Sequence, residues 1–206
     1  MDDKLIELLA RVETVFWRYG VKSVTMDDIA KELKISKKTL YKFVKDKSDL
    51  VVKVLEGHCE LDKVVVHDAI ENAENAIDEL MRVSEMLGQK LQQINPSFHY
   101  DLEKYYPEAW TVFSEHKENF ILNCVKQNLV RGVEEGIYRD NLNAEVISQL
   151  YIHKIDCIFD SSIFPVGKFN FFEVFLELMR YHIRGVSNEK GNIYLAQKMK
   201  KDHSNF

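Results

Sequence analysis

The sequence predicts an all-α fold, in which a small N-terminal three-helix domain precedes a larger helical body. The 206 residues contain only 3 Pro and 8 Gly, the residue types that most often interrupt helices. Apolar residues recur at the spacing of an amphipathic helix in the long segments. The composition is 46% hydrophobic and 30% charged, which is ordinary for a globular chain with a real core.

The first predicted helix carries one apolar stripe at helical spacing. The stripe comprises Leu5, Leu8, Leu9, Val12, Phe16 and Tyr19. Gly20 follows it and is the expected C-cap, because glycine readily adopts the left-handed conformation that ends helices. We expect this helix to cover the core side of the two short helices that come next.

Residues 24–55 predict two short helices joined by a tight turn and followed directly by a third helix. The expected N-caps are Thr25, Ser36 and Asp46. The turn between the first two helices contains Lys34. The second helix, predicted over residues 37–43, buries Leu40 and Phe43 and exposes its other side chains.

This stretch is basic although the chain as a whole is acidic. Seven lysines lie between Lys31 and Lys47 against Glu32 and Asp46, a local charge of +5, whereas the chain carries −5. A cationic helix that also shows a hydroxyl and a phenol suits a phosphate backbone with base edges beside it. Charge alone also fits a solvated lysine-rich face. The caps, the apolar positions and the tight turn together favour a helix-turn-helix.

A further pattern runs through the same stretch. It comprises Thr25, Ile29-Ala30, Thr39-Leu40-Tyr41, Val44 and Lys47-Ser48-Asp49-Leu50. In this order the residues resemble the DNA-binding segment of the TetR family of transcriptional regulators. The remainder of the chain matches that family only in length and all-helical character. The resemblance implies a homodimer that binds a palindromic operator and is released by a small ligand.

Two positions depart from the family pattern. Lys34 occupies a turn position where the family usually has Gly, and a left-handed Lys there would cost about 1 kcal/mol. Asp27 lies where some members offer a basic or neutral phosphate contact.

The candidate DNA-contacting residues follow from the exposed side of the second helix and from the resemblance. On the exposed side, the candidates for contacts to base edges or nearby phosphates are Lys37, Lys38, Thr39 and Lys42. The resemblance implies that Tyr41 and Lys47 contact backbone phosphates. It also implies that Thr25 adds a hydroxyl or backbone donor at the start of its helix.

The third helix is predicted to run from Asp46 towards His67, unless Gly57 ends one helix and starts another. A second amphipathic segment over residues 70–94 stops at Asn95-Pro96-Ser97. Pro107, within the aromatic-rich residues 98–113, is expected at or near a helix N-terminus. A further long helix is predicted over residues 120–133.

The aromatic stripe over residues 98–113 has two interpretations. Such a stripe is more often plain core than a ligand site. Its tyrosine, tryptophan and histidine tips around an apolar hollow also suit a small-molecule pocket. The candidate pocket residues are Met81, Phe98, His99, Tyr105, Tyr106, Trp110, Phe113 and His116.

Two C-terminal helices are predicted over residues 144–160 and 169–185. The second is apolar over most of its circumference, so it must be covered on more than one side. Either it is deeply buried within the chain or its other face meets a second subunit. The resemblance implies that these two helices form the interface of the homodimer that a palindromic operator requires. The candidate interface residues are Ile147, Tyr151, Ile155, Phe172, Phe175 and Met179.

We therefore predict three parts. Residues 1–46 form the helix-turn-helix DNA-binding domain, residues 47–186 the helical ligand-binding and dimerisation domain, and residues 187–206 a polar tail that is weakly ordered or a short helix. Residues 1–50 hold 11 Lys and Arg and 9 Asp and Glu, a balance of +2, and the rest of the chain carries −7. The positive end of the molecule is therefore N-terminal.

The expected partners are double-stranded DNA, a second copy of the chain and an unidentified small-molecule effector. The predicted function is a ligand-responsive transcriptional regulator, acting as a repressor. The alternative is a helical small-molecule-binding or protein-interaction module without sequence-specific DNA binding. Sequence preference with a steep salt dependence would separate the two.

Enzyme, metal and membrane functions find little support. His153, Asp156 and Cys157 could share a helical face as metal ligands, but no other Cys or His cluster completes a site. No HExxH, GxSxG or Gly-rich phosphate loop occurs. We expect no catalytic residue, metal or cofactor. No signal peptide or membrane span is apparent, and three scattered cysteines suit a reducing cytoplasm.

Overall fold

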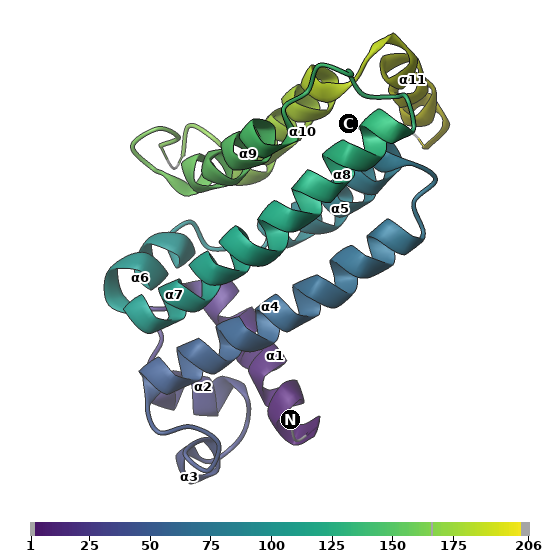
Figure 1. Ribbon diagram of the computed structural model, residues 1–206. Helices are drawn as coiled ribbons and strands as arrows, with labels where there is room; N and C mark the ends of the chain where they lie inside the picture. The colour runs from purple at the N-terminus through teal and green to yellow at the C-terminus, as the bar shows by residue number, and fades with distance from the viewer. Residues whose placement is uncertain (1–2, 166, 203–206) are drawn as a thin grey trace. The chain divides into compact units, whose positions relative to one another are not determined.

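A computed structural model of the chain describes residues 3–165 and 167–202 (Figure 1). The predicted all-α fold is confirmed. Within the described residues the only β-type pairing is an isolated bridge between Tyr138 and Ser187. The helices are α1 Asp3–Tyr19, α2 Met26–Glu32, α3 Lys37–Leu40, α4 Lys47–Glu71, α5 Ala76–Leu91, α6 Phe98–Tyr105, α7 Pro107–Glu115, the π-helical η1 His116–Ile121, α8 Leu122–Glu134, α9 Ala144–Phe159, α10 Phe171–Val186 and α11 Glu189–Asp202.

The described residues divide into two compact units. The first contains the described residues up to 64 together with 93–116, and the second contains 65–92 and the described residues from 117 onward. α4 contributes to both units and runs without a break through Gly57. The domain boundaries after residues 46 and 186 stay predictions, because a compact unit does not define where one function ends and another begins.

The first unit is built on a core to which α1, α2, α3, α4, α6 and α7 all contribute. Its fully buried side chains include Val12 and Phe16 of the predicted α1 stripe, whereas Tyr19 at the end of that stripe is 45% exposed. Gly20 has a φ of +82° and its N–H donates to the Phe16 carbonyl at 2.9 Å, which confirms it as the C-cap of α1.

The second unit contains a ring of four helices. α5 packs on α8, α8 on α9, α9 on α10, and α10 on α5 (Figure 1). The core inside the ring is apolar, and Met179 and Ile183 of α10 are fully buried there. Gly88 of α5 allows the approach of α10, because a Cβ on Gly88 would lie 2.7 Å from the Phe172 ring.

One predicted segment is wrong in its extent. Residues 70–94 do not form a single amphipathic element, because α4 continues to Glu71 and α5 begins only at Ala76. The break is stabilised by Asn75, whose side chain accepts hydrogen bonds from the amides of Ile77 and Asp78. Asparagine is a strong N-cap, and this local bond outweighs the apolar periodicity that continues across it.

The C-terminal segment forms a docked helix in the residues that the structure describes. α11 buries Leu195, and Asn188 ahead of it donates its side-chain amide to the carbonyls of Gly136 and Tyr138, each at 3.0 Å. Gly191 lies directly against the Ile137 carbonyl, so that a Cβ at this position would collide with the carbonyl oxygen.

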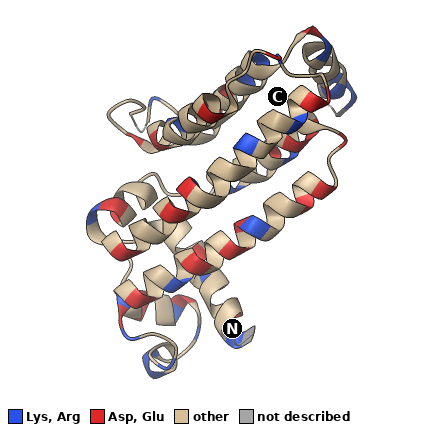
Figure 2. Cartoon of the chain, viewed as in Figure 1, with Lys and Arg blue, Asp and Glu red and all other residues tan. Residues whose placement is uncertain are grey.

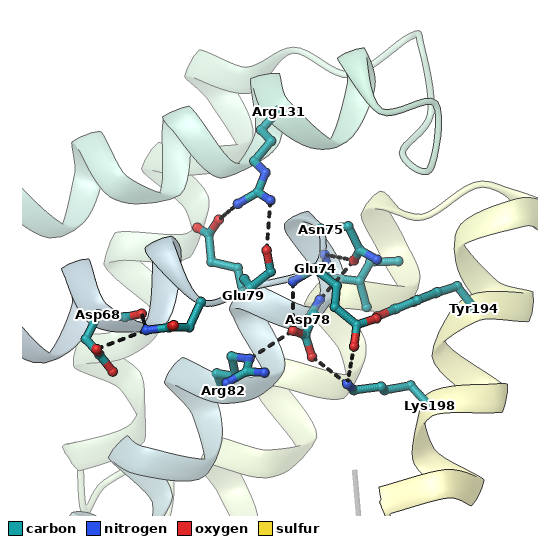
Figure 3. A network of polar contacts seen from close by, with 12 residues as sticks. Asp68, Glu74, Asn75, Asp78, Glu79, Arg82, Arg131, Tyr194 and Lys198 are labelled. Atoms are coloured by element: carbon teal, nitrogen blue, oxygen red, sulfur yellow. Dashed lines mark hydrogen bonds and ion pairs between the residues drawn. The ribbon is translucent and has the colours of Figure 1, made fainter.

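A polar network ties α11 to the start of α5 (Figure 3). Lys198 Nζ lies 3.3 Å from Glu74 and 3.0 Å from Asp78, while the Tyr194 hydroxyl donates to Glu74 at 3.0 Å. Burial on its own would raise the pKa of Asp78, but hydrogen bonds from Arg82, the Glu74 amide and Lys198 outweigh it and lower that pKa. Asp78 is therefore a charged, fully partnered anchor for α11.

We expect Gly191→Ala to destabilise the protein by about 1–3 kcal/mol, because the added methyl group forces α11 away from Ile137. The matched control is Gly185→Ala in α10, where a Cβ meets nothing within 4 Å. This control should be neutral or stabilising by up to about 1 kcal/mol. Urea unfolding of both variants measures the difference, and equal stabilities would contradict the tight approach.

A half-buried imidazolium ties α1 to α4 within the first unit. His58 Nδ1 lies 2.6 Å from the Glu13 carboxylate, and His58 Nε2 lies 3.2 Å from Asp62. Burial alone would lower the pKa of His58, but hydrogen bonds and charges from Asp62 and Glu13 raise it to about 9. His58 is thus positively charged between two carboxylates at neutral pH.

This raised pKa predicts a pH-dependent stability. The unfolded chain has a His pKa of about 6.5, so the ion pairs contribute fully below that pH and the contribution is lost as the pH rises to about 9. We expect wild type to lose up to about 3 kcal/mol more than His58→Gln between these limits. Urea unfolding at both pH values measures the two losses. Parallel losses would show that His58 is not the titrating group.

Candidate nucleic-acid interface

The three predicted caps around the tight turn are confirmed. Thr25 and Asp28 form a capping box, in which the Asp28 amide donates to Thr25 Oγ1 at 3.2 Å and the Thr25 amide donates to Asp28 Oδ2 at 2.9 Å. Ser36 Oγ accepts from the Thr39 amide at 3.0 Å. Asp46 accepts from the Asp49 amide at 2.9 Å at the start of α4.

The second helix of the motif is shorter than the predicted residues 37–43. α3 ends at Leu40, and beyond it the Phe43 amide bonds to the Leu40 carbonyl at 3.0 Å, a three-residue rather than four-residue step. Lys53 of α4 donates to the Phe43 carbonyl at 3.0 Å. This long-range bond holds the tightened turn and is not visible in the local sequence pattern.

Lys34 adopts the left-handed conformation that the turn requires, with a φ of +57°. Its amide donates to the Lys31 carbonyl at 3.1 Å, and Arg11 of α1 donates to the Leu33 carbonyl at 2.8 Å. The end of α2 is therefore held from both sides. A side chain with a Cβ is strained in this conformation, where glycine is not.

The lysines of α3 and of the turn after it differ in their pairing. Lys37 forms an ion pair with Asp27 of α2 at 2.9 Å, and this hydrogen bond and charge raise the pKa of Lys37. Lys38 and Lys42 are exposed and make no hydrogen bond or ion pair through Nζ to any part of the chain that the structure describes. Figure 2 shows basic residues on the short α3 helix. Two ammonium groups therefore remain available to a phosphate or a base edge.

The hydroxyl groups predicted as DNA contacts already have protein partners. The Thr25 hydroxyl donates to Asp28 at 2.6 Å, and the Thr39 hydroxyl lies 2.8 Å from Ser36 Oγ. Tyr41 is 44% exposed at the end of α3. Of these three predicted contacts, Tyr41 is the one whose hydroxyl forms no hydrogen bond to the described residues.

Lys47 lies half-buried in the first turn of α4. Its Nζ donates to the Lys22 carbonyl at 3.3 Å and lies 5.6 Å from the centre of the Tyr106 ring. Burial lowers the pKa of Lys47, while the charges of Asp101 and Asp28 act in the opposite direction. Lys47 is thus positioned by its neighbours rather than free in solvent.

The predicted pocket residues are distributed over two cores. Phe98, Tyr106, Trp110 and Phe113 pack against the core of the first unit. His99 joins them, with its ring 4.7 Å from Trp110 and edge-on to it. Tyr105 is exposed, His116 is buried at the start of η1, and Met81 lies in the core of the second unit. The structure therefore groups the aromatic residues together but places Met81 in a different core.

The predicted interface residues divide by burial. Tyr151, Phe175 and Met179 are buried in the core of the second unit, while Ile147, Ile155 and Phe172 are partly exposed. The large apolar residues of the same helices that are exposed are Val146, Leu150 and Tyr181, at 50%, 49% and 69%. The accessible apolar surface of α9 and α10 is thus carried mainly by residues that sequence reasoning did not select.

Two of the candidate metal ligands, Asp156 and Cys157, have other contacts in the structure. Both carboxylate oxygens of Asp156 lie 2.6 Å from the buried ammonium of Lys117, and Cys157 contacts the His153 carbonyl. Among the described residues no group of three or more His, Cys, Asp or Glu side chains is arranged to hold a metal ion. No helix in the described part of the chain is long and apolar enough to span a membrane.

The sequence analysis does not predict two pairings that shape this surface. Asp27 neutralises Lys37, and Lys53 holds the end of the α3 turn. Each pair is ten residues apart and joins two different elements. Only the helix-turn-helix geometry brings these side chains together, so helical periodicity gave no signal for them.

Comparison with known proteins identifies the family. The profile described as "Bacterial regulatory proteins, tetR family" matches residues 8–54. YvaF of Bacillus subtilis (strain 168), an uncharacterised HTH-type transcriptional regulator, is 30% identical over 146 residues, which span 67% of this chain and 72% of that protein. The chain belongs to the TetR family of transcriptional regulators.

Solved structures share the TetR-family fold at low identity. A transcriptional regulator from Saccharomonospora viridis in complex with choline has a TM-score of 0.72 and 15% identity, covering 91% of this chain and 100% of that one. FadR from Bacillus subtilis in complex with stearoyl-CoA has a TM-score of 0.64 and 15% identity, covering 88% and 99%. The resemblance to the family that residues 25–50 carry is therefore confirmed.

In this TetR-family protein we expect Lys34→Gly to raise the free energy of unfolding by about 1 kcal/mol, because glycine removes the strain of the left-handed turn. The same change at Lys31, inside α2, should lower stability by about 1 kcal/mol. Urea unfolding of the two variants provides the test. A loss of stability in Lys34→Gly would mean that the Lys34 side chain stabilises the turn.

Proposed function

We propose that this TetR-family regulator binds a palindromic DNA operator as a homodimer, represses transcription there, and is released when a small molecule occupies its C-terminal body. The observation that carries the proposal is the pairing pattern on α3. Lys38 on α3 and Lys42 in the turn after it are exposed without partners in the described residues, and this segment is anchored at both ends. Such a rigid, basic helix fits the major groove.

The roles of the contacts follow from their surroundings. Lys38 and Lys42 are the proposed base-edge or adjacent phosphate contacts. Lys47 and Tyr41 are the proposed phosphate contacts, because Lys47 is held in place by the Lys22 carbonyl and Tyr41 is exposed beside α3. Lys37 contributes less, since Asp27 already neutralises its charge.

The proposed dimer uses the exposed faces of α9 and α10. Val146 and Leu150 lie one turn apart on α9. Lys154 of α9 places its Nζ 4.9 Å from the centre of the Tyr181 ring on α10. An exposed tyrosine and two exposed aliphatic residues form an apolar surface that a second copy can cover. Two copies would place two α3 helices on the two halves of a palindrome.

Support for a small-molecule effector comes from the relatives and from the aromatic cluster. Proteins with the same fold bind choline and stearoyl-CoA. In this chain Trp110, Phe113 and His99 form contacting rings on α6 and α7, which offer apolar faces and a polar tip. We further propose that the protein acts in the cytoplasm and is not an enzyme, in keeping with its family.

Selection of the purified protein against a random duplex pool at near-physiological salt tests the proposal. Enrichment of a two-fold symmetric sequence supports a dimeric, sequence-specific regulator, and the enriched duplex then serves as a probe for release by small molecules. Salt-sensitive binding without sequence preference would overturn it. The basic surface of α3 would then serve non-specific contacts.

We expect Lys47→Ala to weaken binding to all duplexes alike and to lower the salt slope by about one per protomer, because a phosphate contact releases counterions. Lys38→Ala should instead change which sequences are preferred, by about 1–3 kcal/mol at one base position. Lys37→Ala, paired with Asp27, is the matched control with the smaller effect. Fluorescence anisotropy over a salt series measures all three, and an unchanged slope in Lys47→Ala would remove that assignment.

A further inference from the structure

A second basic surface lies on the first unit, outside the helix-turn-helix. We name it the α6 patch and define it as Lys22, Tyr100, Lys104 and Tyr105. Lys104 Nζ donates to the Tyr100 hydroxyl at 2.5 Å and lies 5.4 Å from the centre of the Tyr105 ring. Lys22 Nζ lies 3.9 Å from the centre of the same ring. The ammonium groups of Lys22 and Lys104 therefore both lie near the Tyr105 ring.

The patch is joined to the proposed DNA-contacting surface through Lys22. The Lys22 carbonyl accepts from Lys47 Nζ at 3.3 Å, and the Lys22 amide donates to Asp101 of α6 at 2.9 Å. Asp101 also accepts from the Ser97 hydroxyl at 3.2 Å. One residue thus links the first turn of α4 to α6, and the patch continues from the position of Lys47.

The two lysines of the patch differ from the lysines that form ion pairs with carboxylates. Several exposed lysines in the described residues pair with carboxylates, as Lys63 does with Glu60 and Lys126 with Glu145. The partners of Lys22 and Lys104 are phenol rings and a hydroxyl, which carry no opposing charge at neutral pH.

The acidic residues of α6 are Asp101 and Glu103. Asp101 is buried and its carboxylate accepts bonds from the Lys22 amide and Ser97, so it faces inward. Glu103 is the exposed acid of α6. The α6 patch thus contains two exposed lysines, and α6 contains one exposed carboxylate.

The side chains of the patch are accessible to a large partner. Tyr100 is 52% exposed and Tyr105 is 38% exposed, and both lysines are exposed. Lysine ammonium and tyrosine hydroxyl groups are donors that protein–DNA interfaces direct at phosphate oxygens. The rings also restrict the lysine side chains, so less conformational entropy is lost when a phosphate binds.

We propose that the α6 patch is a second contact surface for duplex DNA, which binds backbone phosphates flanking the half-site that α3 reads. This proposal rests on the proposed function for the position of the half-site. Its recognition chemistry is independent of base sequence, because lysine and phenol donors read phosphates and not base edges. The patch therefore adds affinity and salt dependence without changing which operator is preferred.

The test compares two duplexes, one limited to the selected operator and one extended by about ten base pairs, a helical turn, on each side. Wild type should bind the extended duplex more tightly, and Lys104→Ala should lose that gain. The salt slope on the extended duplex should fall by about one per protomer in Lys104→Ala. Lys200→Ala, which removes an exposed lysine from α11, is the charge-matched control and should behave as wild type.

The outcomes distinguish failure of this proposal from failure of the proposed function. Equal salt slopes for wild type and Lys104→Ala on the extended duplex would overturn the proposal. It would also be overturned if Lys104→Ala lost as much affinity for the short duplex as for the extended one. If wild type selects no operator, the proposed function fails. Slopes on a random-sequence duplex then still test whether Lys104 contacts phosphates. Loss of polyglutamate binding in Lys104→Ala with unchanged DNA binding would assign the patch to an acidic protein and overturn the proposal.

Discussion

The burial of Leu40 is the constraint on which the DNA-facing surface depends. α3 is a helix of four residues, and a single turn is not stable by itself because nucleating a helix costs more than its first bonds return. Leu40 is fully buried in the core of the first unit. Ser36 caps the start of the helix, and Lys53 holds the Phe43 carbonyl beyond its end. The exposed lysines are therefore positioned by packing and by long-range bonds, not by the helix itself.

Pairing, and not exposure alone, separates the lysines of this surface. Lys37, Lys38 and Lys42 are all exposed, yet Asp27 compensates only Lys37. Breaking this exposed pair costs little, but the Asp27 carboxylate stays beside Lys37 and repels a phosphate that binds there. Lys47 is held by a neutral carbonyl, so its charge stays available although its position is fixed. The local charge of +5 thus overstates the cationic surface that α3 offers.

Local signals in the sequence were sufficient for the caps, the turn and the helical class. Thr25, Ser36 and Gly20 act within a few residues of themselves, so their roles follow from residue type and position. The extent of α3, the pairing of Asp27 and the docking of α11 depend on residues distant in sequence. Apolar periodicity also does not distinguish a side chain buried within the chain from one exposed on a shared face, so it does not separate the buried Tyr151 and Phe175 from the exposed Leu150 and Tyr181.

The membership of α6 and α7 in the first unit bears on how an effector could act. Phe98, Trp110 and Phe113 pack against the same core that contains Leu40. Interiors are close-packed, so a displacement of these rings has to be accommodated by their neighbours in that core. In the proposed function, an effector that moves the aromatic cluster would therefore alter the packing that fixes α3. The response to the effector and the reading of DNA would then share one core, and their coupling would need only that core to have two stable packings.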